Sequence, residues 1–109
     1  MERIVGPGFH ARVYALVRQV PFGRVTTYGD VAAAMGDVTV SRHVGWALAG
    51  LREDDVPWHR VINRAGRISF RGDTARGELQ RALLESEGVT FDAGDRVALA
   101  TLRWLPREG

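Results

Sequence analysis

Apolar residues recur at helical spacing near the start of the chain. Between positions 9 and 20 they fall every three or four residues, which places them along one stripe of a helix. Pro21 and Gly23 follow and are suited to end such a helix. A stripe of this kind is typical of a core-facing surface, so we expect a first helix whose buried face consists of Phe9, Val13, Leu16, Val17 and Val20.

Two further helices are predicted in close succession. Residues 26–36 begin with a hydroxyl residue suited to an N-cap, continue with an alanine-rich interior and end in glycine. After a turn through residues 37–39, a third helix is expected from Val40 or Ser41 to about Gly50, with an inward face of Val44, Ala47, Leu48 and Leu51. Two short helices joined by a tight turn suggest a helix-turn-helix, a pattern that alone indicates DNA binding only weakly.

The second half of the chain predicts a short extended region and a long helix. Apolar residues on both sides of 63–66 predict a hairpin with glycine at the turn. A helix is expected over residues 74–87, with Gly88 as its C-cap and a short extended piece after it. Residues 97–102 are compatible with a strand, and Trp104 with a tail that packs back on the core.

Composition limits the classes of protein that fit. With 109 residues, 45% of them hydrophobic, the chain suits one domain over residues 1–109 with a single core. There is no cysteine, which excludes a disulfide framework, a thiolate metal site and a cysteine nucleophile. No stretch approaches the ~18 apolar residues of a membrane span. We therefore expect a cytoplasmic protein.

Every basic residue apart from histidine is an arginine. The formal net charge is +2 and the isoelectric point about 9.9. Guanidinium groups suit phosphate and base recognition, although a codon bias toward arginine explains the missing lysines equally well. From Val56 to Gly72 there are four arginines, at positions 60, 64, 67 and 71, and no acidic residue. Such a local cluster is typical of a site for a polyanion.

Four sequence blocks carry a family resemblance. They are residues 20–32 (VPFGRVTTYGDVA), 41–48 (SRHVGWAL), 56–63 (VPWHRVIN) and 83–88 (LLESEG). In these blocks and their order, over about residues 9–91, the chain is similar to the alkyltransferase-like proteins. Those are relatives of the O6-alkylguanine-DNA alkyltransferases that lack the acceptor cysteine. The resemblance implies a single α/β domain like the C-terminal domain of the alkyltransferases, with a winged-helix-like helix-turn-helix and a small hairpin.

The resemblance also implies which residues contact DNA. Arg42 aligns with an arginine finger that takes the place of an extruded nucleotide when the second helix of the motif enters the minor groove. Tyr28 aligns with a tyrosine that helps to rotate the target nucleotide, and small residues at positions 41 and 45 let the helix approach the groove floor. The expected DNA-binding residues are Thr27, Tyr28, Ser41, Arg42, Gly45 and Arg60.

Trp58 stands where the alkyltransferases carry their nucleophilic cysteine. An indole cannot replace a thiolate as a nucleophile, so the resemblance implies a protein that binds the lesion and does not remove its alkyl group. We expect a lesion pocket lined by Tyr28, Leu48, Trp58, Val61, Arg71 and Gly72. For Arg71 two roles stay open: its guanidinium stacks on the flipped purine, or it contacts a phosphate at the rim.

His59 and Glu87 match the histidine and glutamate that activate the cysteine in the alkyltransferases. Here we expect a structural hydrogen-bonded pair, with a water-activating base as the sharper alternative.

The expected function is recognition of O6-alkylguanine in double-stranded DNA by a monomer without metal or cofactor. Such a protein would flag the lesion for nucleotide excision repair proteins and would be associated with the nucleoid if the source is prokaryotic. A hydrolase or glycosylase using His59 and Glu87, and a regulatory DNA-binding module indifferent to damage, remain as alternatives.

Overall fold

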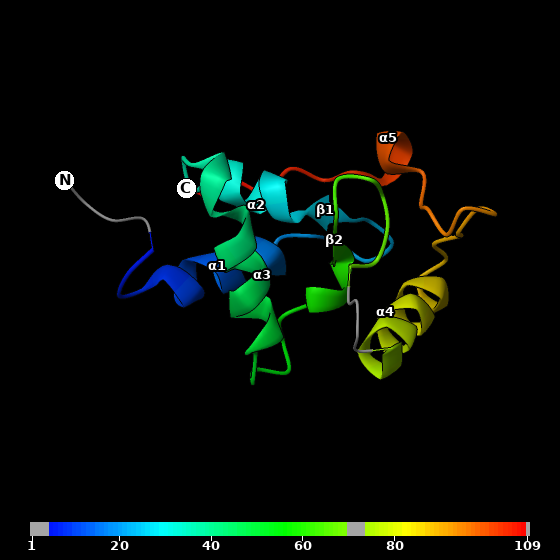
Figure 1. The fold of residues 1–109 in the computed structure, drawn as a ribbon, viewed down its shortest axis with the longest axis horizontal. Coiled ribbons are helices and arrows are strands. Elements are labelled where there is room, and N and C mark those ends of the chain that lie inside the picture. Colours follow the sequence, from blue (N-terminus) through cyan, green and yellow to red (C-terminus); the bar gives the residue numbers. More distant parts are fainter. Residues whose placement is uncertain (1–4, 70–73, 109) are drawn as a thin grey trace.

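The computed structural model describes residues 5–69 and 74–108. The small sheet lies in the middle of the molecule, with α1, α2 and α3 on one side and α4 on the other (Figure 1). The first helix, α1 (Phe9–Arg18), buries all the apolar residues of the predicted stripe that it contains, and Val20 just beyond it is buried as well. The prediction for the first helix is confirmed.

The predicted helix-turn-helix is present. It consists of α2 (Tyr28–Ala34), a short 3-10 turn η1 (Val38–Val40) and α3 (Ser41–Ala49). Thr27 is the N-cap of α2: its hydroxyl accepts a hydrogen bond from the backbone N–H of Asp30, and the Asp30 carboxylate accepts one from the backbone N–H of Thr27. This reciprocal capping fixes the start of α2, and therefore the position of Tyr28.

The sheet differs from the predicted hairpin. β1 (Thr26–Thr27) and β2 (Val61–Ile62) pair in parallel, although they lie far apart in the sequence. The expected hairpin turn does form, because the backbone N–H of Asn63 donates to the Arg67 carbonyl over 3.0 Å and Gly66 adopts φ +80°. The following residues up to 69 do not add a strand. Instead, β2 pairs with β1. This pairing places the segment before α2 beside the segment after Trp58.

Helix α4 (Thr74–Ser86) matches its predicted bounds to within one residue. Its buried residues are Gln80 and Leu84, both 0% exposed, whereas Leu79 is 51% exposed. This helix therefore buries a polar side chain and leaves a leucine on its surface.

The end of the chain forms a helical turn, α5 (Leu99–Leu102), and the predicted strand over residues 97–102 is wrong. The Ala98 carbonyl accepts hydrogen bonds from the backbone N–H groups of Thr101 and Leu102, which closes a turn that a strand cannot make. The tail does pack back, as expected: the backbone N–H of Trp104 donates to the Val25 carbonyl over 2.7 Å.

Two clusters of buried residues form the core, and β2 joins them. Val61 belongs to the larger cluster with α1, α2 and α3, and Ile62 belongs to the smaller one with Leu84 of α4. Successive residues of a strand point to opposite faces, which is how two adjacent residues reach both clusters. Among the helices of the described ranges, none combines the length and apolar character that crossing a bilayer requires.

Candidate functional site

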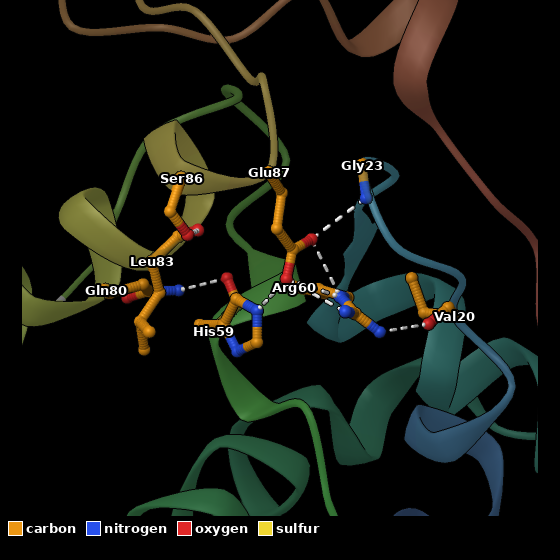
Figure 2. Close-up of polar contacts among 8 residues, drawn as sticks. All are labelled: Val20, Gly23, His59, Arg60, Gln80, Leu83, Ser86 and Glu87. Carbon is orange, nitrogen blue, oxygen red and sulfur yellow. Dashed lines mark hydrogen bonds and ion pairs between the residues drawn. The ribbon is translucent and has the colours of Figure 1, made fainter.

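Glu87 is the centre of a hydrogen-bond network that holds the segment after Trp58. Its carboxylate accepts from Arg60 Nη2 over 2.8 Å, from Arg60 Nε over 3.0 Å and from the backbone N–H of Gly23 over 2.9 Å. His59 Nε2 lies 2.6 Å from the same carboxylate, as Figure 2 shows. An ionised carboxylate only accepts hydrogen bonds, so Nε2 carries the hydrogen. The structure therefore brings His59 and Glu87 together as direct partners.

The environment of Glu87 keeps it ionised. Burial raises the pKa of this carboxyl, but the hydrogen bonds from Arg60, Gly23 and His59 outweigh burial and lower the pKa to about 2. The side chain of Glu87 is only 6% exposed. A buried carboxylate with so many donors is a fixed anchor and a poor acceptor of protons at neutral pH.

Arg60 faces the interior and not the surface. In addition to its bonds with Glu87, its Nη1 donates to the Val20 carbonyl over 2.9 Å, and its side chain is 16% exposed. The sequence predicted a DNA contact for this residue. The structure places its guanidinium between the carboxylate of Glu87 and the carbonyl of Val20, and the DNA contact stays a prediction.

Two of the four arginines that cluster along the sequence have their own surroundings in the structure. Arg60 points to Glu87, and Arg67 lines a separate groove of about 570 Å³ together with Arg81 and Phe91. Arg71, the fourth member of that run, lies outside the described residues, as does Gly72. A run of charges along the chain therefore does not by itself place Arg60 and Arg67 on one surface.

Gln80 supports the same segment from α4. Its Nε2 donates to the carbonyl of His59 over 3.1 Å and to the carbonyl of Val61 over 2.9 Å. Together with the Glu87 network, these bonds hold the residues on the C-terminal side of Trp58, and Figure 2 shows the bond between Gln80 and His59. Sequence reasoning missed Gln80, because a glutamine on a helix usually indicates an exposed position.

The guanidinium of Arg76 lies over the ring of Trp58. Its central carbon is 4.7 Å from the ring centroid, within the range of a cation–π contact. Arg76 also donates to the carbonyls of Leu48 and Ala49 over 3.0 and 3.1 Å. These carbonyls end α3, where the negative end of the helix dipole favours a cation. No signal in the sequence singled out this residue, because an arginine in a helix is ordinarily on the surface.

Four of the six residues predicted for the lesion pocket belong to the larger core cluster or pack against it. Leu48 and Val61 are buried in the larger core cluster, and Tyr28 and Trp58 pack against it as partly buried side chains. Trp58 itself is in the 3-10 turn η2 (Trp58–Arg60) that leads into β2. The two chain segments that carry Tyr28 and Trp58 are thus held side by side by the β1–β2 ladder.

Helix α3 borders an open groove of about 840 Å³. Arg42 and Trp46 are exposed residues on it, and Tyr28 contributes from α2. A Cβ added at Gly45 would stand 3.8 Å from the Tyr28 ring, an ordinary van der Waals distance, so the ring lies beside the helix at this position. The groove is lined by Tyr28, Ser41, Arg42, Gly45, Trp46, Ala49 and Ser69.

Tyr28 keeps its proton under ordinary conditions. Burial raises the pKa of its hydroxyl, and the Ser69 hydrogen bond and the charge of Arg76 offset only part of that effect. The Ser69 hydroxyl donates to the Tyr28 oxygen over 3.1 Å. The hydroxyl hydrogen of Tyr28 therefore remains free to be donated. Thr27, expected as a DNA contact, is 5% exposed, so the structure gives it the task of orienting Tyr28.

Comparison with known proteins agrees with this arrangement. Residues 8–89 match the family described as 6-O-methylguanine DNA methyltransferase, DNA binding domain. The chain is 38% identical over 99 residues to a DNA base-flipping protein of Vibrio parahaemolyticus, covering 90% of this chain and 97% of that protein. It is 45% identical over 82 residues to alkyltransferase-like protein 1 of Schizosaccharomyces pombe, covering 74% and 76% of the two chains.

A solved structure extends the likeness to the fold. The crystal structure of S. pombe Atl1 in complex with damaged DNA containing O6-carboxymethylguanine matches with a TM-score of 0.81 and 36% identity, over 97% of this chain and 100% of that one. The match includes the helix-turn-helix, the small sheet and α4. The chain therefore belongs to the family of the 6-O-methylguanine DNA methyltransferase DNA-binding domain, and within it to the alkyltransferase-like proteins.

Proposed function

We propose that this protein recognises O6-alkylguanine in double-stranded DNA without repairing it. It enters the minor groove with α3, turns the damaged nucleotide out of the helix and holds the alkylated base beside Trp58. The observation that carries this proposal is a tryptophan at position 58 inside an otherwise complete framework of His59, Arg60 and Glu87. The relative from Vibrio is named a DNA base-flipping protein, and S. pombe Atl1 was crystallised with damaged DNA.

Alkyl transfer is absent from this proposal for a chemical reason. The sequence contains no cysteine, and the indole of Trp58 has no ionisable group that could attack an alkyl carbon. The retained pair of His59 and Glu87 then serves to position the backbone. Glu87, with a pKa of about 2 and several donors on its carboxylate, is unsuited to act as a general base near neutral pH.

The DNA surface in this proposal is the groove along α3. Arg42 is exposed on the helix and fills the gap that the extruded nucleotide leaves in the base stack. Tyr28 stands beside the helix at Gly45 and presses on the target nucleotide, with a hydroxyl hydrogen available for a phosphate or base edge. Extruding a base takes a few kcal/mol, and less when an alkyl group has already weakened its pairing, so selection begins at this step.

The pocket side of the proposal uses Trp58, Leu48 and Val61 from the described residues. The ring of Trp58 offers a flat surface on which a purine can stack, with an expected contribution of about 1 to 3 kcal/mol per base. Arg71 and Gly72 complete the predicted lining. Arg76 holds Trp58 from the α4 side, so the ring is fixed before a base arrives.

A lesion that is bound but not altered must be removed by other proteins. We propose that the bound protein, acting as one domain and as a monomer, marks the site for nucleotide excision repair. It is expected in the compartment that holds the chromosome, cytoplasmic and nucleoid-associated if the source is prokaryotic. Sedimentation of the protein alone tests the monomer, and recruitment of excision repair proteins to a damaged duplex, with and without this chain, tests the handover.

The central experiment compares duplexes that differ only in one base. Fluorescence anisotropy with matched guanine and O6-methylguanine duplexes, at one stated salt concentration, should show tighter binding to the damaged duplex. Mass spectrometry of the protein and of the recovered oligonucleotide should show both unchanged. Equal affinity for the two duplexes would instead support a regulatory DNA-binding module. Free base or restored guanine would support a hydrolase or glycosylase.

The role of Arg42 is tested by substitution. Arg42→Ala should weaken binding to duplex more than binding to a single strand, because only stacked duplex presents a gap to fill. Arg52 is an exposed arginine outside this groove, so Arg52→Ala serves as the matched control for the loss of one positive charge. If Arg42→Ala leaves duplex affinity unchanged, the wedging role is refuted.

A further inference from the structure

Trp46 is a large apolar side chain that the fold leaves uncovered. It lies on α3 and is 60% exposed, which is far more than a tryptophan usually is. Its position is within the groove that also contains Arg42 and Tyr28. Exposed aromatic side chains of this kind commonly mark a contact surface.

The ring of Trp46 is connected to the core through contacts between aromatic side chains. His43 meets it edge-on, with ring centroids 4.9 Å apart at 68°. His43 in turn meets Phe9 of α1, with centroids 6.5 Å apart at 82°, and Phe9 is buried. A side chain that is held in place before binding loses less conformational freedom when a partner arrives. Trp46 is therefore both exposed and oriented.

The spacing of Trp46 from Arg42 matches the repeat of DNA. The two residues are four positions apart, so they share one face of α3 and are separated by about 6 Å along its axis. Nucleotides follow one another at about 3.4 Å along a strand. If Arg42 occupies the place of the extruded nucleotide, Trp46 reaches a nucleotide about two steps away.

We propose that Trp46 is a second DNA-contacting residue, which packs its indole against the sugar and base edge of a nucleotide about two steps from the flipped one. This inference rests on the proposed function, because it uses the placement of Arg42 in the base stack. Trp46 lies outside the lesion pocket, so its contribution is the same for damaged and undamaged duplex.

The groove favours DNA over a protein partner as the occupant. Its lining is continuous with the surface of Tyr28 and Arg42, and it contains one arginine and no acidic residue. The minor groove presents deoxyribose faces that suit an indole ring and phosphates that suit the indole N–H. A docking protein would need only the apolar ring of Trp46, whereas DNA can use both the ring and the indole N–H.

The test compares two exposed tryptophans. Trp46→Ala should weaken binding to damaged and undamaged duplexes alike, each by about tenfold, so that the ratio of the two affinities stays constant. Trp104 is also exposed, at 36%, but lies in the C-terminal tail, and Trp104→Ala should change either affinity by less than twofold. Trp46→Phe retains a ring and should lose less than Trp46→Ala. Circular dichroism melting checks that all three variants fold as the original chain does.

Several outcomes would overturn this inference. Trp46→Ala within twofold of the original chain on both duplexes would assign the ring to a protein partner. A loss restricted to the damaged duplex would place Trp46 in the lesion pocket. The proposed function is tested separately, since it depends on whether the unmodified chain prefers the damaged duplex, a result that Trp46 does not affect.

Discussion

Replacing Glu87 by glutamine tests the framework around Trp58 most directly. The substitution keeps the shape of the side chain and one acceptor oxygen but removes the charge. Arg60, 16% exposed, then lacks its carboxylate, and His59 loses its ionised partner. Breaking a buried ion pair on one side destabilises a protein strongly, by about 3 to 5 kcal/mol when the pair is fully enclosed.

The pKa of Glu87 gives a second value for the stabilisation that this carboxylate contributes. Folding lowers the pKa of Glu87 from 4.5 to about 2. At roughly 1.4 kcal/mol per pKa unit, this corresponds to about 3 kcal/mol of stabilisation. Because the pKa is depressed in the folded state, the stabilisation is complete above pH 4.5 and is lost as the pH falls toward 2. The two arguments agree on about 3 kcal/mol, a large share of the stability of a small domain.

The assay is urea unfolding followed by circular dichroism at pH 6 and at pH 3. At pH 6 the free energy of unfolding of the original chain should exceed that of Glu87→Gln by about 3 kcal/mol. At pH 3 this difference should be smaller by about 2 kcal/mol. Other carboxylates titrate alike in both proteins, so their contributions cancel in the difference between the two free energies of unfolding. Glu85→Gln is the control: Glu85 is half exposed and lies 3.5 Å from Arg81, so its removal should change stability by less than about 0.5 kcal/mol. An equal gap at both pH values would refute the assignment of Glu87 as a buried ionised anchor.

Two further substitutions concern α4. Gln80→Leu should lower the free energy of unfolding by about 2 kcal/mol, because the carbonyls of His59 and Val61 lose their donor inside the core, and thermal melting measures the loss. Arg76→Met keeps the length of the side chain but removes the guanidinium from the Trp58 ring, and should reduce the preference for damaged over undamaged duplex about fivefold. Unchanged preference in anisotropy titrations would show that Trp58 needs no support from α4.

The helices could be predicted from the sequence because their signals are local. Apolar spacing and caps placed α1, α2, α3 and α4 within two residues of their observed ends. The sheet could not be predicted in the same way. Two-residue strands are too short to show an alternating pattern, and β1 meets β2 through a pairing between distant segments.

Site residues that belong to a sequence motif could be predicted. Residues whose role depends on how distant elements pack could not. The blocks around Trp58 and Arg42 identified the residues that the structure gathers near α3 and β2. Arg76 and Gln80 carried no signal, because their roles arise only when α4 packs against the end of α3 and against β2. For the same reason the ion pair between Arg60 and Glu87 could not be predicted from the sequence around Arg60 alone.

The bonds that hold the turn around position 58 come largely from its neighbours. The Gln80 amide holds the main chain at His59 and Val61, and Glu87 holds the side chains of His59 and Arg60. The main chain and side chains that follow position 58 are therefore held by Gln80 and Glu87. Codons for tryptophan and cysteine differ by a single nucleotide, so one point mutation at this position separates a chain with a thiol in this turn from a chain without one.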